Sequence, residues 1–181
     1  MDKQIFTIGH STRSIEEFTG ILSSFKIECL ADVRSYPGSK KFPQFNKEEL
    51  SHSLQLVKIN YIHIKELGGR RKVNPQSTNT AWKNKSFRGY ADFMATDEFK
   101  KGIEILTSTA GVSKTAFMCS EAVWWRCHRS MISDYLKSAG WKVIHILDKN
   151  KSEEHPYTKP AKIINGKLVY GAEDDSLNLF N

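Results

Sequence analysis

The stretch QIFTIGHSTRSIEEFTGILSSF, residues 4–25, decides the fold class, because it predicts a buried strand, a turn and an amphipathic helix in succession. Its apolar run ends at Gly9, which is typical of a buried strand that gives way to a turn. Ser14 and Glu17 form a capping box, and the apolar residues that follow them have helical spacing. Strand, turn and helix in this order open a βαβ unit.

The same alternation continues along the chain. Further apolar runs typical of strands cover residues 27–33, 61–64, 115–119 and 141–147. Asn46 and Glu49 predict the start of a second helix, and another is expected over residues 122–139, with Gly140 as its stop. We therefore predict an α/β fold with a five-stranded, mostly parallel, doubly wound sheet of the Rossmann or flavodoxin type, and helices on both faces.

The chain has 181 residues, which suits a single domain. We expect residues 1–150 to form the α/β domain and residues 151–181 a tail that packs on it, where Asn165-Gly166 predicts a hairpin. No apolar run is long enough to cross a bilayer, and no signal-peptide pattern follows Met1. Three cysteines are too few for a disulfide-stapled secreted fold, so we expect a cytoplasmic protein with reduced thiols.

The net charge of +7 is unevenly distributed along the chain. Residues 35–47 contain three lysines and no acid, and residues 67–90 contain six basic residues, again without an acid. Two acid-free basic segments favour an anionic partner. A solvated surface whose charge serves solubility is the alternative.

Ligands of open α/β sheets bind outside the carboxyl ends of the strands, so the residues at these ends are the candidates for function. We predict Cys119 as a nucleophile, Asp32 or Glu121 as a proton carrier, and His10 as an assisting group. A turn residue is the alternative for His10, and a carboxylate placed to suit the helix dipole is the alternative for Glu121, which we expect in the first turn of the helix at 122–139.

Cys119 is expected to have a lowered pKa, because it ends a strand and faces a helix N-terminus and nearby arginines. A small buried hydrophobic residue is the alternative, and it is favoured for Cys127. A phosphatase-type loop is excluded, because the residue six positions after Cys119 is Trp125 and not an arginine. A zinc site of Cys119, Cys127 and His128 is not expected either, because adjacent residues on a helix point about 100° apart. We therefore expect no metal and no cofactor.

Arginine side chains match the geometry of phosphate and carboxylate groups. The candidate anion ligands are Arg34, Arg70, Arg71, Arg126, Arg129 and His128. Aromatic residues lie among them, at Tyr36, Phe42, Phe45, Trp82, Phe87, Trp124 and Trp125. Basic residues interleaved with aromatic rings are typical of proteins that bind nucleotides or single-stranded nucleic acid, although the two adjacent tryptophans also suit a core-facing helix.

Five short motifs occur in one order along the chain: Ile8-Gly-His-Ser-Thr12, Ala31-Asp-Val-Arg34, Leu67-Gly-Gly69, Cys119-x-Glu121 and Cys127-His-Arg129. Together they resemble the YeaO-like family, domain of unknown function 488, over residues 5–147. The resemblance implies a compact bacterial or archaeal α/β domain but no particular activity. The family's motif positions correspond here to His10, Asp32, Arg34, Cys119, Glu121, Cys127, His128 and Arg129.

Our first hypothesis is an enzyme that acts on a phosphate-bearing substrate, either a nucleotide or a nucleic acid, at the carboxyl ends of the strands. Arg34, Arg70 and Arg129 would hold the phosphate. A non-catalytic module that binds single-stranded nucleic acid and a domain that senses a nucleotide are the alternatives.

Overall fold

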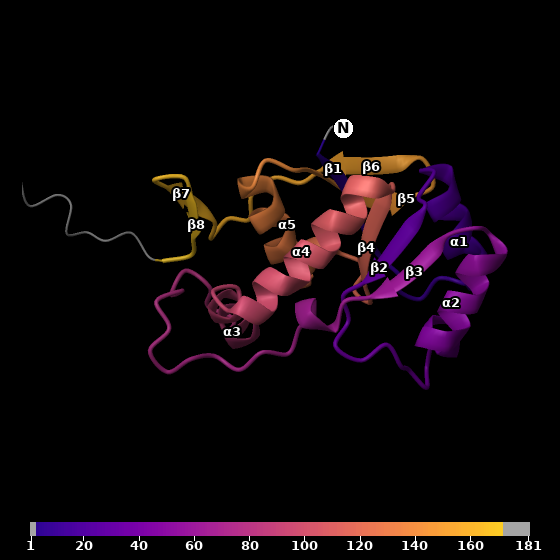
Figure 1. Ribbon diagram of the computed structural model, residues 1–181. Helices are drawn as coiled ribbons and strands as arrows, with labels where there is room; N and C mark the ends of the chain where they lie inside the picture. Colours follow the sequence, from indigo (N-terminus) through magenta and orange to yellow (C-terminus); the bar gives the residue numbers. More distant parts are fainter. Residues whose placement is uncertain (1–2, 172–181) are drawn as a thin grey trace, which may run out of the picture.

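The structure, a computed structural model, describes residues 3–171, so that residues 172–181 of the expected tail lie outside it. A sheet with the strand order β3-β2-β4-β1-β5-β6 forms its centre (Figure 1). Its strands are β1 (Gln4–Gly9), β2 (Cys29–Asp32), β3 (Asn60–His63), β4 (Thr115–Cys119), β5 (Lys142–Asp148) and β6 (Lys151–Glu154). The first five run parallel, and β6 pairs antiparallel with β5.

The predicted α/β class and the mostly parallel sheet are confirmed, and the apolar run at residues 115–119 coincides with β4. The predicted count of five strands is wrong, because β6 adds a sixth. All four residues of β6 are exposed, so the strand has no apolar run; it is held by edge pairing with β5 and by the side chain of Glu153, which accepts a hydrogen bond from Trp124 Nε1 at 2.6 Å. The hairpin predicted at Asn165-Gly166 is present and joins β7 (Lys162–Ile164) to β8 (Lys167–Val169).

The helices lie between the strands along the chain. Their bounds are α1 (Ile15–Ser24), α2 (Lys47–Leu56), α3 (Lys85–Phe93), α4 (Asp97–Val112) and α5 (Arg129–Ser138), with the short 3₁₀ turns η1 (Pro43–Phe45), η2 (Lys65–Leu67) and η3 (Trp124–Arg126). The predicted cap of α1 is confirmed, since Ser14 Oγ accepts a hydrogen bond from the Glu17 N–H at 3.1 Å. Asn46 is the N-cap of α2, but its side chain accepts from the Ser39 N–H at 2.6 Å instead of from the helix.

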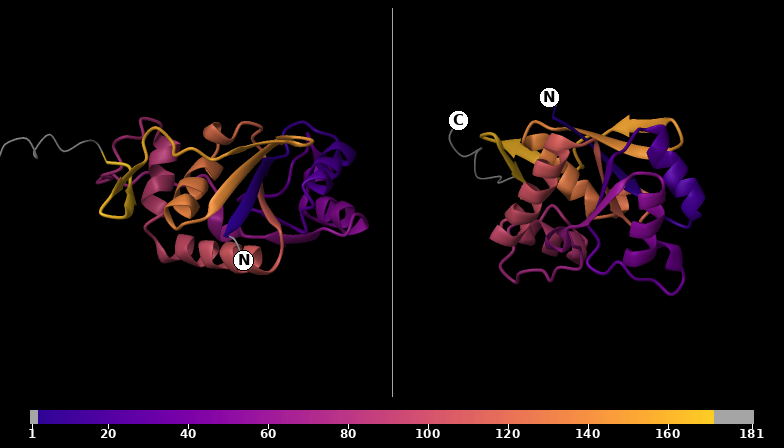
Figure 2. Two further views of the ribbon diagram at one scale, coloured as in Figure 1. Left: turned by 90° about the horizontal axis from the view of Figure 1, so that it is seen from above. Right: turned by 45° about the vertical axis from the view of Figure 1, so that its right-hand side comes forward.

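Alternate residues along the strands join two separate apolar clusters. Ile5 of β1 belongs to the cluster that includes α3, α4 and α5, whereas Phe6 and Ile8 belong to the cluster that includes α1 and α2. Figure 2 shows these two groups of helices with the strands between them. Each fully buried large apolar side chain in these clusters contributes about 1.5–3 kcal/mol to the free energy of unfolding.

The helix predicted over residues 122–139 begins later than expected, because α5 starts at Arg129. The preceding residues form η3 and irregular backbone, and Trp124 of η3 packs in parallel on the ring of His145 at 4.3 Å between centroids. The three consecutive apolar residues Val123-Trp-Trp125 are compatible with the start of a buried helix, but only one of the two tryptophan side chains is buried. Glu121 is therefore not in the first turn of a helix.

A buried polar network ties the C-terminal segment to α5. The carboxylate of Asp134 accepts hydrogen bonds from His155 Nε2, from the N–H and Oγ1 of Thr158, and from the Tyr170 hydroxyl, at 2.6–3.0 Å. Asp134 and His155 are both fully buried. Within residues 3–171, no helix has the length and apolar character that crossing a membrane requires.

Candidate functional site

A cavity of about 430 Å³ opens where the strands β1, β2 and β4 end. Its wall contains residues from both acid-free basic segments, 35–47 and 67–90, which lie far apart in the sequence. The first contributes Ser35, Tyr36 and Phe42, and the second contributes Gly69, Arg70 and Phe87. These two segments bring basic side chains and no carboxylate to the cavity, and Glu121 of the segment after β4 is the acidic residue among those that line it.

The turns after β1 and β4 are fastened to each other at the cavity. The His10 N–H donates to the Cys119 carbonyl at 3.0 Å, and the Ser11 N–H donates to the Ser120 carbonyl at 2.9 Å. Gly9 permits this closeness, because a Cβ atom there would lie 1.8 Å from the carbonyl oxygen of Glu121. His10, Cys119 and Glu121 consequently share one wall, as expected from their positions at strand ends.

Arg129 was a candidate anion ligand, but the structure places it inside the protein with 1 % of its surface exposed. Its guanidinium donates from Nη1 to Thr7 Oγ1 at 3.0 Å and from Nη2 to the Glu121 carbonyl at 2.6 Å. Arg129 is absent from the cavity wall. Its contacts assign it to holding the segment 120–128 against β1.

Asp32 is fully buried and bound on both oxygens. It pairs with the Arg34 guanidinium, from Nε at 2.9 Å and from Nη2 at 2.5 Å, and accepts from the Tyr61 hydroxyl at 2.8 Å. Burial and the neighbouring Asp32 carboxylate raise the pKa of the Tyr61 hydroxyl. A carboxylate with these contacts orients Arg34 and does not face the cavity, so the structure does not bring Asp32 to where a substrate would lie.

Arg34 reaches the cavity beside His10. Its Nη1 lies 3.4 Å from His10 Nε2, and His10 Nδ1 donates to the Ser11 carbonyl at 2.9 Å. The ring stacks on Phe45 with 4.1 Å between centroids. Burial, and then the Arg34 charge, lower the pKa of His10 to about 4, so the imidazole is neutral near pH 7 and its Nε2 accepts hydrogen bonds.

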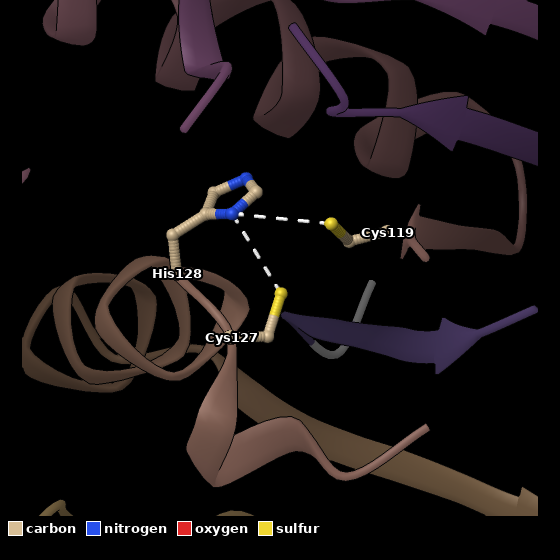
Figure 3. A group of neighbouring side chains, drawn as sticks. All are labelled: Cys119, Cys127 and His128. Carbon is tan, nitrogen blue, oxygen red and sulfur yellow. Dashed lines mark hydrogen bonds between the residues drawn. The ribbon is translucent and has the colours of Figure 1, made fainter. Parts of the chain in front are cut away.

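Cys119, Cys127 and His128 meet at one point of the cavity wall (Figure 3). His128 Nδ1 lies 3.9 Å from Cys119 Sγ and 3.6 Å from Cys127 Sγ. Cys127 has extended backbone between η3 and α5, and His128 is the N-cap of α5. The argument that a helix would turn these two side chains apart is therefore wrong.

The pKa values of the two thiols shift in opposite directions. The hydrogen bond with Cys127, together with burial, raises the pKa of Cys119 to about 12. Burial acts to raise the pKa of Cys127, but the hydrogen bond with Cys119 and the Arg129 charge outweigh it and lower that pKa to about 6. The lowered pKa expected for Cys119 therefore falls on Cys127, which sequence reasoning had assigned to packing.

Of the remaining candidates, Arg70, Arg126, Glu121 and His128 line the cavity, and Arg71 does not. Arg71 instead pairs with Glu98 at 3.0 Å and covers the Phe93 ring at 3.6 Å from its centroid. Sequence reasoning missed Tyr90, whose buried ring lies in the wall and contacts His128 at 5.1 Å between centroids. The helical spacing of apolar residues around Tyr90 predicts a core residue and does not indicate a residue of a functional site.

A family model described as domain of unknown function DUF488 matches residues 14–136. This region includes every residue of the cavity wall except His10. No curated protein matches the chain, and no solved structure matches it.

Proposed function

Because the chain belongs to the DUF488 family, whose description names no activity, we propose its function from the cavity: an enzyme that acts on a phosphate-bearing substrate, a nucleotide or a nucleic acid. The observation that carries this proposal is the pair Arg70 and Arg126. Both side chains line the cavity, and neither has a hydrogen-bond or ion-pair partner within residues 3–171. Unpaired guanidinium groups beside a cavity are suited to binding an anion.

Two other arginines near the cavity differ from Arg70 and Arg126 because they have carboxylate partners. Arg71 follows Arg70 directly, yet it is neutralised by Glu98. Arg34 lines the cavity but is neutralised by Asp32, and its Nη1 lies 3.4 Å from His10 Nε2. Positive charge that no carboxylate offsets is thus concentrated at Arg70 and Arg126, and Arg126 directly precedes Cys127 and His128 of the thiol–imidazole cluster.

The reacting centre that we propose is the cluster of Cys119, Cys127 and His128 on the same wall. Glu121 is exposed and lines the cavity, which suits a group that carries a proton to or from a substrate. His10 supplies a neutral acceptor. The raised pKa of Cys119 lowers the fraction of this thiol that is ionised near pH 7, and Asp32 acts by orienting Arg34.

The architecture supports the same location. We propose that the sheet is doubly wound, in the manner of Rossmann or flavodoxin-like folds, since its two apolar clusters draw on different helices. In such sheets the ligand binds beyond the carboxyl ends of the strands, where the order of strands reverses. Here β1 and β4 are neighbours at the centre of the sheet, and both end at the cavity.

The test is ligand binding by the full-length protein, measured by calorimetry with inorganic phosphate, nucleoside monophosphates and short oligonucleotides. We expect one of these to bind, and Arg70→Ala and Arg126→Ala each to weaken it about 10- to 100-fold, because each removes a charge-assisted hydrogen bond. Arg71→Ala is the matched control and should leave the affinity unchanged. If no phosphate-bearing compound binds, or if Arg71→Ala has the same effect as the other two, the proposal fails.

A non-catalytic module that binds single-stranded nucleic acid is the second candidate. It is favoured by Tyr36, whose side chain is 76 % exposed at the cavity rim within the segment that carries Lys40 and Lys41. An exposed aromatic ring among lysines is suited to stacking on a base. This candidate predicts affinity that rises with oligonucleotide length and falls steeply with salt, together with loss on Tyr36→Ala and no turnover of the bound strand.

A further inference from the structure

We propose that Cys119, Cys127 and His128 form a zinc site with three protein ligands and a fourth position that opens into the cavity. The three ligand atoms all lie within 4.8 Å of one another. This inference deepens the proposed function and rests on it for the use of the open position. The binding of the ion stands on the geometry of the cluster alone.

The two nitrogen–sulfur separations in the cluster are close to those that a zinc ion imposes. Tetrahedral zinc bonded at about 2.3 Å to sulfur and about 2.0 Å to nitrogen holds these two atoms about 3.5 Å apart. Nδ1 of His128 lies 3.6 Å from Cys127 Sγ and 3.9 Å from Cys119 Sγ, and Figure 3 shows both sulfurs facing the same ring nitrogen. Both nitrogen–sulfur separations are thus within about 0.4 Å of that value, and the two sulfurs lie within 4.8 Å of each other.

The imidazole is already oriented for this role. Its Nε2 lies 3.1 Å from the Val33 carbonyl, which accepts hydrogen bonds and cannot donate them. Nε2 therefore carries the proton, and the lone pair of Nδ1 points at the two sulfurs. A histidine whose distal nitrogen donates to a backbone carbonyl is the usual arrangement around a protein-bound metal.

Buried elements hold the ligands in place. Cys119 ends the central strand β4, and Cys127 and His128 precede α5, whose first residue Arg129 is anchored to β1 through Thr7. Gly69 leaves room for the ring, because a Cβ atom there would lie 3.0 Å from His128 Nδ1. The positions of the ligands are thus set by the fold before any ion binds.

The ligand chemistry selects zinc over the hard divalent cations. Two sulfurs and one imidazole nitrogen suit Zn²⁺, whereas Mg²⁺ and Ca²⁺ require oxygen. Two thiolates also neutralise the charge of the ion. Three protein ligands leave a fourth position for water or substrate, which is the pattern of catalytic rather than structural zinc. All three ligands line the cavity that also contains Arg126 and Glu121.

The experiment uses the full-length protein, reduced and stripped of metal by a chelator, and titrated with Co²⁺ without oxygen. We expect one equivalent to give a sulfur-to-cobalt charge-transfer band and the visible bands of tetrahedral cobalt, and Zn²⁺ to displace it. Cys119→Ser, Cys127→Ser and His128→Ala should each weaken Co²⁺ binding by more than about 100-fold, which exceeds the loss for an outer-shell partner. Cys29→Ala removes the third buried thiol and is the matched control that keeps the spectrum.

Circular dichroism of each variant without metal separates a lost ligand from a lost fold. Absence of the charge-transfer band in the wild type, its persistence in Cys119→Ser and Cys127→Ser, or oxidation of the two thiols to a disulfide with no metal uptake would each overturn the zinc site. Arg70→Ala/Arg126→Ala should retain the full cobalt spectrum. Cobalt binding without binding of any phosphate compound would leave the zinc site standing and refute the proposed function, and the reverse result would refute the zinc site alone.

Discussion

Arg129 donates a hydrogen bond of 2.6 Å to the backbone carbonyl of Glu121, so a fully buried cation of α5 holds the loop that forms one wall of the cavity. The same guanidinium also binds Thr7 Oγ1 on β1. Arg129 thus links α5, the loop and β1. These contacts explain how the backbone of residues 120–128 is held in one conformation although it contains only one 3₁₀ turn.

The first prediction is that Arg129→Met is strongly destabilising. It keeps most of the side-chain volume but removes both donors, which leaves the Glu121 carbonyl and the Thr7 hydroxyl short of a partner. We expect a loss of about 2–4 kcal/mol in the free energy of unfolding, measured in urea. Arg126→Met, an exposed residue three positions earlier, should change it by less than about 0.5 kcal/mol. Similar losses for the two variants would contradict this role of Arg129.

The second prediction concerns Gly9 and the same loop. A Cβ atom at Gly9 would lie 1.8 Å from the Glu121 carbonyl oxygen, so Gly9→Ala must displace the backbone at the cavity. We expect it to cost about 1–3 kcal/mol and to weaken ligand binding. Gly20→Ala is the matched control, because a Cβ atom meets nothing within 4 Å there, and this helical position should gain up to about 1 kcal/mol. Equal effects on the two unfolding curves would refute the close approach.

The sequence predicted those elements that are buried and therefore consist of continuous apolar residues. β4 is five buried residues in a row, and its run ends where the strand ends. β6 consists of exposed polar residues, so no apolar pattern marks it. The predicted start of α5 was wrong because Trp124 is buried against the ring of His145 in β5 and not on a helix face. The spacing of apolar residues near Trp124 gives no information about a contact with so distant a strand.

For the site, sequence reasoning found the edge of the sheet but not the directions of its long side chains. His10, Cys119 and Glu121 line the cavity because each lies at the end of a strand or within two residues of it. Whether an arginine is free depends on which carboxylate or carbonyl the fold brings to it, and this separates Arg70 from Arg71. The grouping of Cys127 and His128 with Cys119 was missed because it depends on where α5 begins.

The third prediction concerns Asp134, which binds four donors with no exposure to solvent. Asp134→Asn replaces one acceptor oxygen by a donor that faces Thr158 or Tyr170. We expect it to cost about 3–5 kcal/mol, as for the loss of one partner from a buried charged network. Tyr170→Phe removes one donor and should cost about 1–2 kcal/mol. Urea unfolding of both variants checks this order, and a larger loss for Tyr170→Phe would contradict the central place of the carboxylate.

The fourth prediction is a loss of stability as the pH falls below 6.5, the ordinary pKa of histidine. Burial and the adjacent His155 lower the pKa of His145 to about 2, and burial and Arg34 lower that of His10 to about 4. Below pH 6.5 these two histidines are therefore protonated in the unfolded chain but not in the folded protein. The free energy of unfolding is at its full value above pH 6.5 and declines as the pH falls towards the pKa values of the folded state. Each histidine accounts for about 1.4 kcal/mol between about pH 7.5 and about pH 5.5.

Variants assign this pH dependence to individual groups. His145→Gln retains a donor towards His155 but cannot titrate, so the fall in unfolding free energy over the same pH interval should shrink by about 1.4 kcal/mol. His52→Gln, on the exposed surface of α2, is the control and should leave the profile unchanged. If His145→Gln retains the full wild-type loss, then His145 accepts a proton in the folded state.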